Sequence, residues 1–193
     1  NAPLLVITGG QVTVPADAWL IDNSIADKIC VLSVSAEANN KEAFGGFNDC
    51  MDPWACYILL EKLDWVILGK VFKSGAPEVT KEWIRDSLPD TPLRQWMIDK
   101  VHPVFPDRYP GNHDWDGHPV CHLLTDAYAV EYKKVSFDGW YDRKFAGMDI
   151  QLPKFKDDAN GNNWVITKAN RKVGSEAWRA AMSNPDAWGK RTR

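Results

Sequence analysis

The sequence predicts an α/β fold, with a mostly parallel, Rossmann-like sheet and helices on both of its faces. Three short apolar runs have the length and composition of buried strands, at residues 3–8, 29–35 and 65–68. Helical patterns at residues 15–25 and 52–63 separate these runs. Because alternating strands and helices are joined by right-handed crossovers, we expect the strands to run parallel.

The first helix and the loop after the second strand come before the most informative part of the chain. The helix has a predicted apolar face that consists of Ala16, Trp19 and Leu20. The loop at residues 37–41 is polar and contains Asn39 and Asn40.

A glycine-rich loop, a helix and a strand occupy residues 44–71, and the rest of the chain is organised around them. Gly45 and Gly46 allow positive φ or the close approach of a ligand. Asn48 follows with an amide that can donate and accept hydrogen bonds. Asp52, with a proline after it, is typical of a helix N-cap. A polar loop before a helix in an α/β unit is where ligand sites tend to form.

The pattern changes in the second half of the chain. The predicted elements there are helices at residues 77–87, 92–101, 123–132 and 175–182, with strands and turns at residues 133–165. Asn160 and Gly161 predict a tight turn. The loop at residues 111–122 is dense in histidine and aspartate, and Asp126 lies near the start of the next helix. The length predicts one domain, residues 1–193, in which residues 133–193 form a mixed strand and helix tail.

Composition and charge exclude some classes of protein. The net charge of −3 argues against nucleic acid as a partner, and no apolar run approaches the length of a membrane span. The first residue is not an initiator methionine, so we expect a processed, cleaved or truncated chain. The compartment stays open between the cytoplasm and the periplasm or exterior.

Cysteine and tryptophan usage favours structural roles. The four cysteines form no CxxC pair, which favours buried free thiols over a zinc site. In an extracytoplasmic protein, Cys50 could form a disulfide with Cys56 or Cys121. Most of the ten tryptophans are expected in the core, while one or two near a cleft could stack on a sugar or a base.

Three segments of the chain together resemble the nucleoside hydrolase family, the calcium-dependent N-ribohydrolases. Residues 3–35 resemble the family's strand, Gly-Pro-Leu-Thr-Asn-type loop, helix and next strand. Residues 47–69 (FNDCMDPWACYILLEKLDWVILG) resemble its Phe-Asn motif, Asp-Pro-Glu-Ala-Ala helix and following strand. Residues 123–132 (LLTDAYAVEY) resemble its His-Asp helix. Their order and rough spacing agree over the first two-thirds of the chain.

The resemblance implies hydrolysis of an N-glycosidic bond by water with a bound calcium ion. It implies that Asn40 and Asn48 bind the sugar and that Asp126 is a calcium ligand. The family's glutamate between the two asparagines falls at Gly46, and its base-side histidine falls at Thr125.

Two further elements of the family pattern are absent from the sequence. Ser33 to Ala36 replace a glycine-rich motif whose carbonyl reaches the metal, and no segment matches the family's first strand with its aspartate cluster. The match therefore covers the middle and carboxyl-terminal portion of the fold. We expect an amino-terminal half or a partner chain to supply the rest, or else a divergent relative.

Each of these residues also has a structural alternative. Asn40 and Asn48 could cap turns, and Asp126 could be the N-cap of its helix. The loop at residues 111–122 is explained by solvation, its commonest cause, or by a transition-metal site. His118 or His122 could replace the missing base-side acid, because imidazole titrates near neutrality, and His122 is the candidate catalytic residue.

Two functions are compatible with these residues. One is a nucleoside hydrolase-like enzyme, completed by its other half. The alternative is a non-catalytic carbohydrate- or ligand-binding protein on the same fold, which the replaced glutamate and the many tryptophans favour. The expected ligand is a nucleoside or a sugar, and a homo-oligomer is left open.

Overall fold

The structure, a computed structural model, describes residues 2–33, 38–40, 43–68, 78–101, 112–113 and 130–184. The chain divides into two compact units. Unit 1 comprises Asn1–Ser74 and Ala129–Ala169, and unit 2 comprises Gly75–Tyr128 and Asn170–Arg193. Each unit is described separately below.

Four parallel strands form one half of the sheet in unit 1. They are β1 (Leu4–Thr8), β2 (Ile29–Ser33), β5 (Asp64–Ile67) and β10 (Asn163–Lys168), in that spatial order. All three neighbouring pairs in this half are parallel. The predicted α/β fold class is confirmed, and the first three strands lie where their apolar runs predict them.

The other half of the sheet is antiparallel. It continues from β10 through β8 (Glu131–Phe145), β9 (Met148–Asp157), β4 (Ala43–Phe44) and β3 (Ala38–Asn40). Two sequence expectations are corrected here. The polar loop expected at residues 37–41 contains β3, and the helix expected to run to residue 132 cannot do so, because β8 already begins at Glu131. At both places strand pairing overrides the local pattern, with the nearby β4 in the case of β3 and with the distant β10 in the case of β8.

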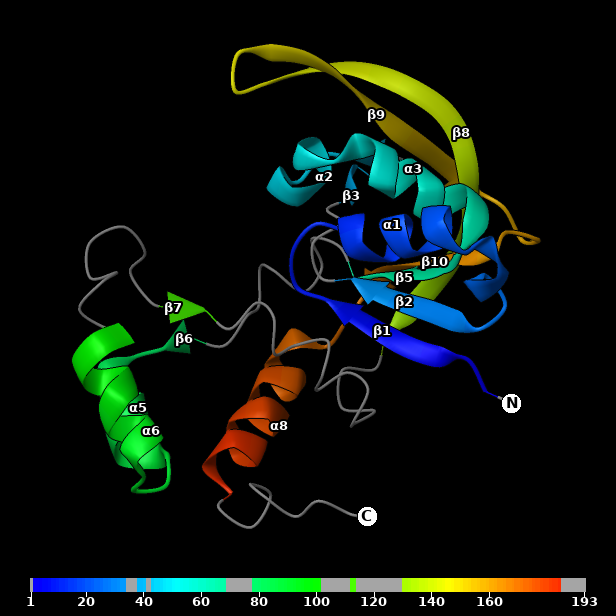
Figure 1. Ribbon diagram of the computed structural model, residues 1–193. Helices are drawn as coiled ribbons and strands as arrows, with labels where there is room; N and C mark the ends of the chain where they lie inside the picture. Colours follow the sequence, from blue (N-terminus) through cyan, green and yellow to red (C-terminus); the bar gives the residue numbers. More distant parts are fainter. Residues whose placement is uncertain are drawn as a thin grey trace. The chain divides into compact units, whose positions relative to one another are not determined.

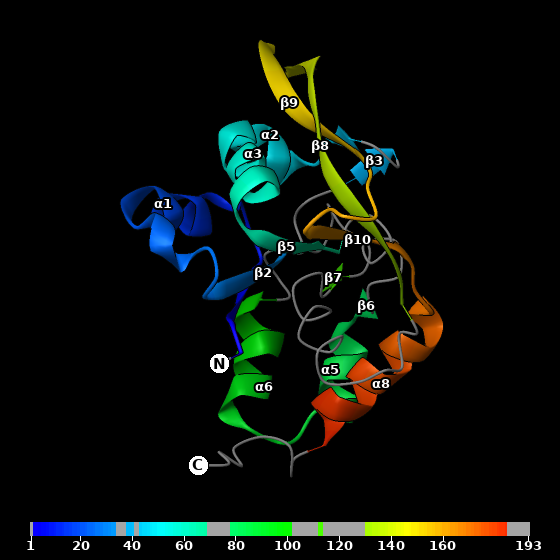
Figure 2. The same ribbon diagram turned by 90° about the vertical axis from the view of Figure 1, so that its right-hand side faces the viewer.

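Three helices accompany the sheet in unit 1. They are α1 (Thr13–Ile21), α2 (Phe47–Met51) and α3 (Pro53–Lys62). α1 and α3 lie side by side over one face of the sheet, and the β8–β9 hairpin passes α2 and α3 and extends beyond them (Figures 1 and 2). Asp52 is the N-cap of α3, as predicted, and its carboxylate accepts a hydrogen bond from the backbone N–H of Ala55 at 3.0 Å.

The helix predicted at residues 15–25 is divided into two parts. Asp22 has an extended backbone (φ −141°) and ends α1, and its carboxylate caps the 3₁₀ turn Asn23–Ile25 through the N–H of Ser24. The predicted apolar face is right for Ala16 and Trp19, which pack on the core. It is wrong for Leu20, whose side chain is 62% exposed.

The core of unit 1 lies between the helices and the sheet. Among its most completely buried large side chains are Leu59, Trp65, Ile67, Phe44 and Phe155. Cys56 is buried on α3, as predicted, and none of Cys30, Cys50 and Cys56 forms a disulfide. The proposed disulfide between Cys50 and Cys56 is therefore absent, while Cys121 lies outside the described residues.

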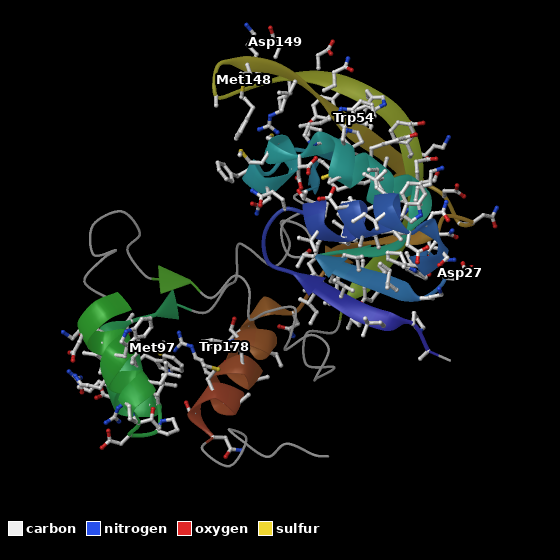
Figure 3. All side chains as sticks on the ribbon, viewed as in Figure 1. Asp27, Trp54, Met97, Met148, Asp149 and Trp178 are labelled. Carbon is white, nitrogen blue, oxygen red and sulfur yellow. The ribbon has the colours of Figure 1, made fainter. Side chains whose placement is uncertain are left out.

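The elements of unit 2 are short except for one helix. They are β6 (Glu78–Val79), α5 (Lys81–Ser87), α6 (Pro92–Trp96), a π-helix (Met97–Val101), β7 (Asn112–His113) and α8 (Arg171–Ser183). Thr80 and Thr91 cap α5 and α6 through their hydroxyls. Trp178 of α8, labelled in Figure 3, stacks on Trp83 of α5 with 5.4 Å between the ring centres. Among the described residues, no helix is both long enough and apolar enough to cross a membrane.

Candidate functional site

The glycine-rich loop forms a tight segment between β4 and α2, which we call the glycine turn (residues 44–46). Its first residue, Phe44, is completely buried. The Phe44 ring stacks on Trp65 of β5 at 5.1 Å and meets the edge of Phe155 of β9 at 5.2 Å. The aromatic core therefore anchors the start of the turn to the sheet.

The inner side of the glycine turn is bound to a buried carboxylate. Asp49 is 2% exposed, and one of its oxygens accepts hydrogen bonds from the N–H of Gly45 at 3.1 Å and of Gly46 at 2.8 Å. Gly46 is the N-cap of α2, and its carbonyl accepts the first helical bond, from the N–H of Cys50 at 3.1 Å. These bonds join the turn and α2 into one unit.

The outer side of the glycine turn is bound to side chains of β8. The Tyr141 hydroxyl donates to the carbonyl of Phe44, and Arg143 Nη1 donates to the carbonyl of Gly45 at 2.6 Å. Burial raises the pKa of Tyr141 above that of a free tyrosine, although the hydrogen bond and the charge of Arg143 act in the opposite direction. The phenol is therefore protonated at neutral pH and serves as a donor.

Asn48 lies two residues after the turn, as the second residue of α2, and its side chain is half-buried. The side-chain amide makes no hydrogen bond within the part of the chain that the structure describes. An amide in this state can accept from one group of a ligand and donate to another, which suits the hydroxyls of a sugar.

A second polar group lies at the carboxyl ends of the parallel strands, the edge of a parallel sheet where ligands bind. Thr8 ends β1 beside Ser33, which ends β2. The buried Ser33 hydroxyl accepts from the indole N–H of Trp65 at 2.7 Å. The Thr8 hydroxyl is also buried, but it has no hydrogen-bond partner.

Asp52 has a structural role, as expected. One carboxylate oxygen caps α3, and the other accepts a hydrogen bond from the Thr13 hydroxyl at the start of α1. Asp52 therefore joins the first turns of two helices, and each of its carboxylate oxygens already has a partner in the protein.

The structure describes the predicted site residues to different extents. Asn48 is described in full, and Asn40 is the last residue of β3, with a side chain outside the described set. Asp126, His118 and His122 lie outside the described residues. The predicted sugar-binding roles of Asn40 and Asn48 and the predicted calcium-binding role of Asp126 are therefore untested and stay predictions.

The described residues do not by themselves form a metal site. Among them, no group of three or more His, Cys, Asp or Glu side chains is arranged to hold an ion. Calcium takes about six to eight oxygen ligands, and the oxygens found near the glycine turn are already bonded within the protein or belong to a single amide. The loop at residues 111–122 lies outside the described part except for the backbone of Asn112 and His113.

Sequence reasoning did not identify four residues that shape this site. Tyr141 and Arg143 are 97 and 98 residues from the carbonyls that they bind, so no local pattern indicates the contacts. The carboxylate of Asp49 and the hydroxyl of Thr8 carry a weak local signal. The first follows two glycines by three positions, and the second ends an apolar strand.

Solved nucleoside hydrolases have a similar fold. A plant nucleoside hydrolase superposes with a TM-score of 0.65 at 14% identity, over 94% of this chain and 62% of that chain. A purine-preferring ribonucleoside hydrolase from Gardnerella vaginalis gives 0.64 at 15%, over 93% and 60%. An inosine-guanosine nucleoside hydrolase gives 0.63 at 15%, over 93% and 61%.

These likenesses establish the fold and not the chemistry, because the identities are low. The expected resemblance to nucleoside hydrolases is confirmed at the level of structure. The chain spans about three fifths of the length of these structures. No protein-family model matches the sequence, and no curated protein sequence matches it.

Proposed function

We propose that this chain forms the sugar-binding part of a nucleoside hydrolase-type site, which cleaves the N-glycosidic bond of a nucleoside or related glycoside. The observation that carries the proposal is the side-chain amide of Asn48, which has no hydrogen-bond partner among the described residues and lies beside a fixed turn in a nucleoside hydrolase-like fold. Asn48 is also the residue at which the chain matches the family's Phe-Asn motif.

The chemistry assigns a task to each residue of the proposed site. Cleavage passes through an oxocarbenium-like state, in which the sugar hydroxyls must be held while water attacks and the base leaves. Asn48 and Asn40 hold hydroxyls, since an amide satisfies both the O–H and its lone pairs. His122 protonates the leaving base, and Asp126 contributes one carboxylate to a calcium ion. The remaining calcium ligands would come from outside the described residues.

Two features indicate that the site is weaker or incomplete in this chain alone. Gly46 occupies the position of the family's glutamate, which removes one contact to the sugar. The chain also spans only about three fifths of the similar structures, so the rest of the site would come from further polypeptide. Activity is therefore expected only when the remaining part of the fold is present.

The test of the proposal is made with the remaining part of the fold present, and it compares Asn48→Ala with the unchanged protein and with Asn160→Ala. Asn160 is an exposed amide in the turn between β9 and β10, and it serves as the matched control. We expect Asn48→Ala to lower calcium-dependent release of ribose from inosine roughly tenfold, because one lost hydrogen bond of about 1.4 kcal/mol corresponds to that factor. Equal activity in the two variants would contradict the assignment of Asn48.

The second candidate function is a non-catalytic sugar-binding protein on the same fold. Gly46 at the position of the family's glutamate favours it. The chain lacks one of the family's sugar contacts and still has the fold, as expected of a protein that binds a sugar without cleaving it. Binding of D-ribose without any release of ribose from inosine, with calcium present and the fold complete, would support this second function.

A further inference from the structure

We infer that Tyr141 and Arg143 of β8 are positioning residues, which set the orientation of Asn48 towards a bound sugar. The inference rests on the proposed function, in which Asn48 binds the sugar. It gives the β8–β9 hairpin a role in the site in addition to its pairing within the sheet.

The backbone pairing of β4 is too short to hold the glycine turn. β4 has two residues, and its contact with β9 is a single pair, Ala43 with Lys154. β4 also pairs with β3, and that pairing contains a register shift. The backbone from Phe44 to Gly46 therefore leaves the sheet with little support from the ladder, and its carbonyl groups need other partners.

Tyr141 and Arg143 supply those partners. The Tyr141 hydroxyl donates a hydrogen bond to the carbonyl of Phe44, and Arg143 Nη1 donates one to the carbonyl of Gly45 at 2.6 Å. The bond from Arg143 is charge-assisted, which makes it stronger than a neutral one. Two successive carbonyls of a flexible turn are thus fixed to one strand.

The fixed turn determines the position of Asn48, because α2 cannot determine it alone. α2 has five residues, which is far below the length at which a helix is stable by itself. Its first turn is instead joined to the glycine turn by the carboxylate of Asp49. A displacement of Gly45 therefore moves Asn48 with it, and two glycines offer little resistance to such a displacement.

The experiment is a double-mutant cycle between Arg143→Ala and Asn48→Ala. Its binding readout is the affinity for D-ribose. Its second readout is the NMR signal of the Asn48 side-chain amide, which needs no ligand. Lys144→Ala is the matched control, since Lys144 is the next residue on β8 and forms only an exposed ion pair with Asp149. Arg143→Lys and Tyr141→Phe are the conservative variants.

We expect Arg143→Ala to shift or broaden the Asn48 amide signal and to weaken ribose binding roughly tenfold, the factor that corresponds to one hydrogen bond. In the Asn48→Ala background the same change is expected to have no further effect on ribose binding, because the residue that it positions is gone. Arg143→Lys should recover part of the affinity, and Lys144→Ala should change neither readout.

Two results would overturn the inference. One is an unchanged Asn48 amide signal in both Arg143→Ala and Tyr141→Phe. The other is a fully additive loss of affinity in the double variant. If the unchanged protein binds no ribose, the proposed function fails, and the amide signal still decides whether β8 positions Asn48.

Discussion

Two adjacent residues of α2 show how position decides the role of a polar side chain. Asp49 is buried and accepts from two backbone N–H groups, whereas the neighbouring Asn48 is half-buried and its amide has no hydrogen-bond partner within the described part of the chain. The carboxylate has a structural role, and the amide is the group for which we propose a ligand. Residue type alone does not separate these roles, since carboxylates are the commoner catalytic groups.

The first prediction concerns the scaffold role of Asp49. In Asp49→Ala, two buried N–H donors lose their acceptor, so we expect unfolding free energy to fall by about 2–4 kcal/mol. Urea unfolding followed by circular dichroism measures this value. The control is Asp142→Ala, which removes an exposed hydrogen bond from Gln151 and should change the unfolding free energy by less than about 0.5 kcal/mol. Similar losses in the two variants would contradict the scaffold role.

The second prediction concerns the pH dependence that Tyr141 gives to unit 1. Burial raises its folded pKa above the free value of 10.0, despite the opposing effect of Arg143. The stabilisation is therefore complete below pH 10.0 and is lost as the pH rises through the folded pKa. Tyr141→Phe should flatten the fall in stability at alkaline pH, measured by urea unfolding across that range. Burial also raises the pKa of Tyr132. Comparison with Tyr132→Phe therefore shows how much of the loss of stability at alkaline pH is due to Tyr141.

At the scale of helices and strands, local sequence patterns predicted the elements whose positions depend on local interactions. The Asp52–Pro53 start of α3 and the apolar runs of β1, β2 and β5 lie where the sequence indicates. The boundaries that the sequence does not show depend on pairing with another strand, nearby or distant. β3 exists because it pairs with β4, and β8 begins at Glu131 because that residue pairs with Lys168 of β10.

The third prediction concerns the turn between β9 and β10, which was predicted from Asn160 and Gly161. A Cβ atom on Gly161 would lie 2.3 Å from the carbonyl oxygen of Val135 and 2.7 Å from its carbon, both in the backbone of β8. Gly161→Ala should therefore lower the unfolding free energy by about 1–3 kcal/mol, since β8 must move. Gly10→Ala meets no atom within 4 Å and is the control. Equal unfolding midpoints in urea for the two variants would show that β8 yields without cost.

At the scale of the whole molecule, the site was predicted only in part. A short motif located Asn48, because the Phe-Asn sequence and the Asp-Pro helix start lie close together in the chain. The side chains that hold the glycine turn were not predicted, since the β8 hairpin is about a hundred residues away and only folding brings it near. The roles of Asn40, Asn48, Asp126 and His122 stay predictions.

The strand at the parallel end of the sheet, β1, has the apolar composition of a strand inside a sheet. β1 is the last strand in the spatial order, and its unbroken apolar run is typical of a strand covered on both faces. Leu4, Leu5 and Ile7 are nevertheless 68%, 40% and 42% exposed. Among the described strands, β1 is paired on one side only, with β2.

The fourth prediction follows from that exposed edge. An apolar strand at the edge of a sheet is prone to pair with a strand of another molecule. We therefore expect copies of this chain to associate with one another as the protein concentration rises. Leu4→Lys should suppress the association, because a charge on an edge strand opposes further pairing. Val14→Lys places the same charge on α1, where Val14 is 75% exposed, and should leave the association unchanged. Sedimentation velocity over a concentration series separates these outcomes, and a chain that stays monomeric throughout would show that the edge of β1 does not attract a strand.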